Sequence, residues 1–113
     1  MGFFEKRELR KKEKQDAKIR AALLPTLHGK VIKYTSERDP ETNTDIILGK
    51  EGSMTIRAGE LIVLSSSQIV FRADINTVNV SELLSGDGVI LEGEDLERGG
   101  AHRKIIAYYL YYR

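Results

Sequence analysis

Residues 60–73, with the sequence ELIVLSSSQIVFRA, decide the fold class because they encode a β-hairpin. After Glu60, residues 61–64 are apolar on both faces of a strand. In residues 68–73, Ile69 and Phe71 alternate with Gln68 and Arg72, and Val70 lies on the second face. Alternation with a period of two is typical of β-strands. Ser65, Ser66 and Ser67 separate the two segments and predict a polar turn.

The same pattern continues on both sides of this hairpin. Helical segments do not alternate with the strands, so a parallel sheet is not expected. The sequence predicts a mainly β fold, a small antiparallel barrel or sandwich of about seven short strands preceded by one N-terminal α-helix. Besides the hairpin, strands are expected at residues 29–35, 45–49, 53–57, 79–84, 89–91 and from 102 onward, with turns at Glu51–Gly52 and at residues 85–88.

The first 24 residues differ from the rest in composition. No Gly or Pro occurs between Phe3 and Leu24, and most of these residues favour helix. Pro25 predicts that the helix ends at Leu24. Apolar residues return at 19–24, so we expect this end to dock on the body. The chain is therefore divided into a basic helical arm, residues 1–25, and a single β domain, residues 26–113.

The net charge of +1 conceals an asymmetry between these two parts. Residues 1–24 carry eight basic and four acidic side chains, and the remainder carries ten and thirteen. The near-neutral total argues against a globally basic nucleic-acid binder. The absence of Cys excludes a disulfide scaffold and thiol catalysis. With no apolar run long enough for a membrane span or a signal peptide, a cytoplasmic location is expected.

No motif indicates catalysis or a cofactor. Asp39, Glu41, Asn43 and Asp45 alternate as in the start of a calcium loop, but the Gly and Glu that complete such a loop are missing. We interpret this segment as a solvated loop. With only two His residues and no nucleophile–base pair, we expect no enzyme activity, no metal site and no small-molecule substrate.

The last strand is apolar on both faces, which is unusual for a strand with one solvated side. Four of the five Tyr residues lie in it. One face has to pack in the core, and the other has to be covered by Leu23 and Leu24 of the arm or by another protein. Tyr suits such an interface. The candidate partner-binding residues are Tyr109, Tyr111 and Ile105.

The basic arm offers a second kind of site. Its cations can contact phosphates of anionic lipid or of nucleic acid, although interleaved Glu residues weaken the case and argue against nucleic acid. The apolar start, Met1 to Phe4, is compatible with peripheral membrane contact. A solvated helix is the simpler interpretation. The candidate anion-contacting residues are Lys6, Arg7, Arg10, Lys11 and Lys14.

The order of short strands from Gly29 to Tyr112, with a Phe71–Arg72 strand leading into residues 78–84, resembles the bacterial pleckstrin-homology-like small β-barrel domains. The resemblance covers most of the β domain and implies a small barrel. In that family a C-terminal helix closes one end of the barrel. This chain ends on a strand, so the N-terminal helix would take that place.

We therefore expect a non-enzymatic binding or assembly module that acts through protein–protein contacts of its β body, self-association included. Either an exposed sheet edge or the surface of Tyr109 and Tyr111 would contact the partner. The alternative is a peripheral binder of anionic surfaces that uses the basic helix.

Overall fold

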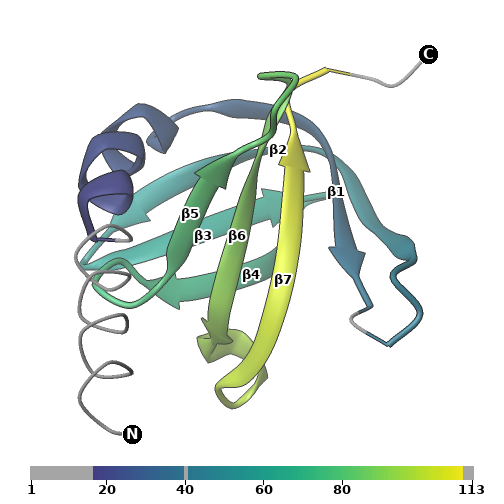
Figure 1. The fold of residues 1–113 in the computed structure, drawn as a ribbon. Helices are drawn as coiled ribbons and strands as arrows, with labels where there is room; N and C mark the ends of the chain where they lie inside the picture. The colour runs from purple at the N-terminus through teal and green to yellow at the C-terminus, as the bar shows by residue number, and fades with distance from the viewer. Residues whose placement is uncertain (1–16, 40, 111–113) are drawn as a thin grey trace, which may run out of the picture.

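The computed structural model describes residues 17–39 and 41–110 and confirms the mainly β fold (Figure 1). Seven antiparallel strands form one sheet in the order β4-β3-β2-β1-β7-β6-β5. A single helix, of which residues 17–27 are described, precedes them. The elements are β1 (Val31–Arg38), β2 (Asp45–Arg57), β3 (Glu60–Ser65), β4 (Gln68–Asp74), β5 (Asn79–Glu82), β6 (Gly88–Asp95), the short 3-10 helix η1 (Leu96–Arg98) and β7 (Ala101–Tyr108).

The sheet is strongly curled but not closed. Strands β2, β3 and β4 lie behind β5, β6 and β7 in Figure 1, so that the two ends of the sheet face each other. β4 contacts β6 and η1, yet no backbone ladder pairs β4 with either β5 or β6. The terms barrel and sandwich therefore describe this sheet only loosely.

Strand β2 is continuous over 13 residues, so the expected turn at Glu51–Gly52 was wrong. Gly52 lies where β2 begins to pair with β3, opposite Ser65. A Cβ atom at this position would lie 1.8 Å from the carbonyl oxygen of Leu64. The glycine therefore permits a close approach between two strands and does not make a turn. Joining the two expected segments leaves seven strands.

The helix ends at Leu27, not at Leu24 as Pro25 had predicted. Leu27 is 2% exposed and Leu24 is 8% exposed, and both belong to the core. Burial of Leu27 explains why the helix continues past a residue that normally disfavours it. The guanidinium of Arg20 donates a hydrogen bond to the carbonyl of Val78, just before β5. The end of the helix thus packs against the β body, as expected (Figure 1).

The two faces of β7 have different neighbours. Ile105 and Ala107 are fully buried in the core, together with Leu24 of the helix. Ile106 is also fully buried but lies on the opposite face of the strand. On that face the ring of Tyr34 stacks on Tyr108 at a centroid distance of 4.3 Å. The second face is therefore covered partly by Tyr34 of β1. Leu23 and Leu24, one of the two expected covers of this face, pack with the core on the first face.

Candidate interaction edge

At one end of the sheet, side chains from β6 and β7 hydrogen-bond to the outer backbone groups of β4. We call such an edge sealed. The carboxylate of Asp95, at the end of β6, accepts a hydrogen bond of 3.2 Å from the backbone N–H of Arg72. The guanidinium of Arg103 on β7 donates to the carbonyl of Val70 at 2.8 Å and to Asp95 at 2.6 Å. Arg98 donates to the same two partners. We call this set, Val70, Arg72, Asp95, Arg98 and Arg103, the polar seam.

The two central charges of the polar seam, Asp95 and Arg103, are buried and paired with each other. Asp95 is fully buried and Arg103 is 9% exposed. Arg103 also makes a bidentate pair with Glu37, which raises the pKa of the guanidinium despite its burial. Burial by itself would raise the pKa of Asp95, but the hydrogen bonds from Arg103, Arg98 and two backbone N–H groups outweigh it and lower that pKa. Both groups therefore remain ionised in the folded protein.

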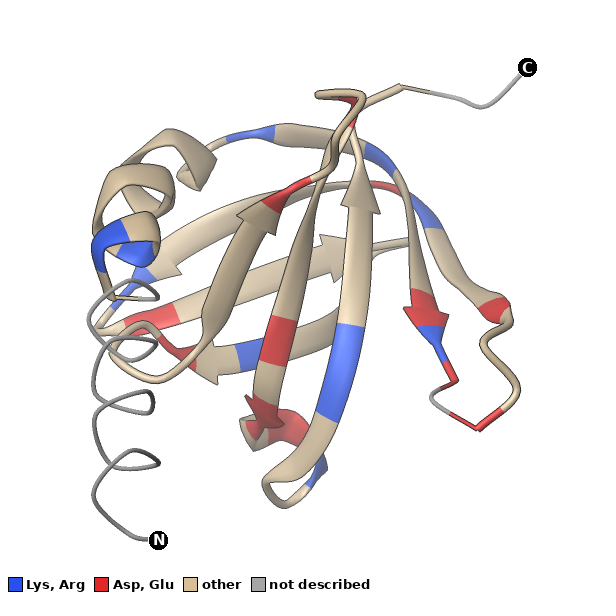
Figure 2. Ribbon diagram, viewed as in Figure 1, with Lys and Arg blue, Asp and Glu red and all other residues tan. Residues whose placement is uncertain are grey.

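A second layer of ion pairs lies at the rim of the polar seam. The guanidinium of Arg72 contacts Glu60 and Glu97, each at 2.8 Å. Figure 2 shows basic and acidic segments facing one another where β4, β6 and η1 meet. These partly exposed pairs contribute little individually. The strand-borne cations Arg72 and Arg103 thus meet carboxylates and do not form a free basic surface.

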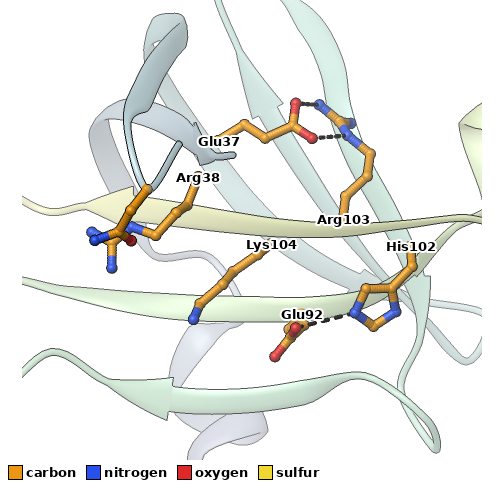
Figure 3. Close-up of a pocket in the computed structure, with 7 residues that line it drawn as sticks. Glu37, Arg38, Glu92, His102, Arg103 and Lys104 are labelled. Carbon is orange, nitrogen blue, oxygen red and sulfur yellow. Dashed lines mark hydrogen bonds and ion pairs between the residues drawn. The ribbon is translucent and has the colours of Figure 1, made fainter. Parts of the chain in front are cut away.

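A pocket of about 240 Å³ lies beside the seam, on β1, β6 and β7 (Figure 3). Most of its charged groups bond to one another: Glu37 to Arg103, and His102 to Glu92 at 3.1 Å. Lys104 lies opposite Glu92 in the β6–β7 register. The lining carries three permanent cations and two carboxylates, and the remaining cation, Arg38, is paired with Asp45. The pocket therefore has a mixed charge that does not select one kind of ligand. Its lining is Glu37, Arg38, Asn43, Glu92, His102, Arg103 and Lys104.

The start of β2 contrasts with the sealed end of the sheet. β1 pairs with β2 from Asp45 onward, whereas β3 reaches β2 only from Gly52 onward. Ser66 hydrogen-bonds to both backbone groups of Lys50. Its hydroxyl oxygen accepts from the N–H of Lys50, and its own N–H donates to the carbonyl of Lys50. Among the described residues, no strand pairs with the other side of residues 45–49. We call these five residues the β2 free edge.

The beginning of the β2 free edge exposes apolar side chains, whereas Leu48 packs partly against the core and Gly49 is buried. Ile46 and Ile47 are 61% and 64% exposed, and as consecutive strand residues they project to opposite faces. Asp45 begins the edge and pairs with Arg38 at 2.9 Å, and the exposed Lys50 follows its last residue. An unpaired strand flanked by exposed apolar side chains is typical of a site that receives another strand.

The residues predicted to bind a partner lie elsewhere. Ile105 is fully buried in the core, so its side chain has no surface to offer, and that prediction is corrected. Tyr109 packs partly against the core, and the ammonium of Lys30 lies 4.7 Å from its ring centre. Burial, and next the charge of Glu82, raises the pKa of Tyr109. Tyr111 and the arm residues Lys6, Arg7, Arg10, Lys11 and Lys14 lie outside the described residues.

The acidic segment and the serine turn behave as local structure. Asp39 accepts a hydrogen bond from the backbone of Glu41. Ser66 and Ser67 adopt positive φ angles of 51° and 63° in the β3–β4 turn, which confirms the predicted turn.

Residues 17–39 and 41–110 contain no group of three or more His, Asp or Glu side chains arranged to hold a metal ion. No helix within this described part has the length and apolar character to cross a membrane. Comparison with known proteins finds no family model that matches this chain, and no matching curated protein or solved structure.

Proposed function

We propose that this protein is a non-enzymatic binding or assembly module that acts through protein–protein contacts, with the β2 free edge as its binding element. The observation that carries the proposal is the exposure of Ile46 and Ile47 beside an unpaired stretch of strand. An added strand would satisfy the backbone groups of this edge, and its side chains would cover the two isoleucines.

The other edges of the sheet are less suited to this role. On β4, the carbonyl of Val70 and the N–H of Arg72 already bond to the polar seam. β5 has only four residues, and Arg20 of the helix bonds to the carbonyl of Val78 beside it. Folded proteins commonly protect sheet edges in these ways. The two outermost strands, β4 and β5, are therefore protected, whereas the apolar β2 free edge is open, which favours a role in binding.

The dimensions of the free edge define what fits it. Five residues of strand span about 17 Å at roughly 3.4 Å per residue. A complementary segment would be extended and apolar on both faces at its centre, to meet Ile46 and Ile47. Most charged side chains beside this edge are held in pairs, as in Arg38–Asp45. This arrangement supports recognition of a polypeptide more than chemistry on a small molecule.

The proposal is tested by placing a charge on the edge. Ile47→Lys would introduce a cation where a partner strand must pack, a common device against edge pairing. Val31→Lys is the matched control, because Val31 is also β-branched, lies on a strand and is 62% exposed. The tagged full-length chain would be cross-linked in cells, purified and analysed by quantitative mass spectrometry for other proteins and for self-cross-links.

We expect Ile47→Lys to reduce the main association at least about tenfold, and Val31→Lys to retain it. Val31 follows Lys30, which contacts Tyr109, so the control also probes the Tyr109 surface. Loss of association in Val31→Lys alone would assign binding to that surface and overturn the proposal. Equal association by both variants and the unchanged chain, or no association at all, would overturn it as well.

A further inference from the structure

We infer that the strand that occupies the β2 free edge is the same edge of a second copy of this chain, paired antiparallel about a two-fold axis. This inference rests on the proposed function and names its partner. The result would be a dimer in which the two sheets continue into one another through their β2 strands.

Symmetry determines which residues meet in such a dimer. When two copies use the same edge around a two-fold axis perpendicular to the sheet, the paired strands run antiparallel. The beginning of one edge then lies beside the end of the other. Asp45 begins the edge, and Lys50 directly follows it. Each Asp45 therefore comes beside Lys50 of the other copy, at both ends of the paired segment.

The sequence of the edge is complementary to its own reversal. Residues 45–50 read DIILGK: an acid, three apolar residues, a glycine and a base. Leu48 has no partner on β1 and shares one position of the ladder with Gly49. In the antiparallel dimer Ile47 therefore lies opposite Ile47 of the other copy, and Ile46 lies opposite its Leu48 and Gly49. The charges at the ends are opposite. Opposite charges across an antiparallel pair favour pairing, whereas like charges oppose it. A parallel, in-register arrangement would bring acid beside acid.

The surroundings of the edge allow a second copy to approach. In Figure 1 the beginning of β2 forms the outer margin of the ribbon, beyond β1, and no other described strand lies outside it. Asp45 remains 34% exposed at its side chain although it pairs with Arg38, so its carboxylate can still be reached. The net charge of the chain is only +1, so two copies repel each other weakly.

The experiment exchanges the two charges of the edge in separate variants. Asp45→Lys leaves two bases on the edge, and Lys50→Asp leaves two acids. Each variant alone would meet like charges at both ends of its dimer, whereas a mixture of the two would restore opposite charges. Sedimentation velocity of the full chain from about 1 μM to about 1 mM measures dissociation constants in the range of a small interface. Circular dichroism melting checks that each variant is folded.

We expect the unchanged chain to dimerise reversibly, each variant alone to dimerise at least about threefold more weakly, and the equimolar mixture to regain most of the affinity. A monomer at every concentration, or a mixture no better than either variant, would overturn the inference. If the chain stays monomeric while Ile47→Lys still abolishes capture of another protein, the inference fails and the proposed function stands. If Ile47→Lys changes neither dimerisation nor capture, both fail.

Discussion

At the edge of β4 and at the beginning of β2, the backbone hydrogen bonding between strands stops. The backbone groups left unpaired by other strands are treated differently at the two places. At β4, Asp95 and Arg103 bond to the exposed backbone groups of Arg72 and Val70. At the β2 free edge, the neighbouring side chains are Ile46 and Ile47, which cannot form such bonds and remain exposed. The contrast indicates that side chains decide whether an edge is sealed or available.

The sealed edge depends on buried charge. Asp95 is fully buried and Arg103 nearly so, and such groups are tolerated only while every partner is present. The free edge buries no charge and depends on no comparable network. We therefore expect substitutions in the polar seam to change the free energy of unfolding strongly and those in the β2 free edge to change it weakly. For association we expect the reverse: substitutions in the β2 free edge should have the larger effect.

The largest effect is expected for Asp95→Asn. The amide has nearly the same shape but carries no charge, so the buried Arg103 loses one of its two carboxylate partners and keeps only Glu37. We expect the free energy of unfolding, measured by urea denaturation at neutral pH, to fall by about 3–5 kcal/mol. Glu94→Gln, at the exposed neighbouring position, is the control and should change it by less than about 0.5 kcal/mol. A loss below about 1 kcal/mol for Asp95→Asn would show that the seam does not hold the two ends of the sheet together.

A smaller effect is expected from acid. The pKa of Asp95 is lowered in the folded protein, so the unfolded chain binds this proton more readily. The stabilisation is complete above the pKa of an unfolded aspartate, about 3.9, and is lost as the pH falls further through the folded pKa. Urea unfolding between pH 7 and pH 2 should show this decrease, and Asp95→Asn should flatten it. Identical pH profiles for the two proteins would contradict the assignment.

The smallest effect on stability is expected for Ile47→Lys. Ile47 is 64% exposed in the single chain and gives up little buried surface when replaced. At a concentration low enough to exclude association, its free energy of unfolding should stay within about 0.5 kcal/mol of the unchanged chain. A loss above about 2 kcal/mol would mean that Ile47 packs within its own chain, and the edge would no longer count as open.

Most of the strands could be predicted because their signals are local. The hairpin of residues 60–73 appears as β3 and β4 with the serine turn where it was expected. The predicted turn at Glu51–Gly52 was wrong because a glycine is compatible either with a turn or with the close approach of two strands. Only the position of the Leu64 carbonyl on β3 distinguishes the two. The helix end predicted from Pro25 was wrong for a similar reason. The helix continues to Leu27, and the burial of Leu27 depends on the whole core.

The candidate site was harder to predict. An apolar pattern on both faces of β7 does not tell which face is inside, so Ile105 was assigned to a surface that it does not reach. The β2 free edge arises because β2 has 13 residues and β3 only six, a mismatch visible only after pairing. One signal was available for the seam. Arg103 shares a strand face with Ile105 and Ala107, and a cation on a core face requires a buried partner.

Amide hydrogen exchange of the full chain, measured by NMR at a low and a high protein concentration, tests the difference between the two edges most directly. The N–H of Arg72, bonded to the buried carboxylate of Asp95, should be protected equally at both concentrations. The outward-facing N–H groups of residues 45–49 should exchange rapidly when dilute and become protected when concentrated. Rapid exchange at Arg72, or protection of residues 45–49 that does not depend on concentration, would contradict a sheet with one sealed edge and one edge open to a second copy.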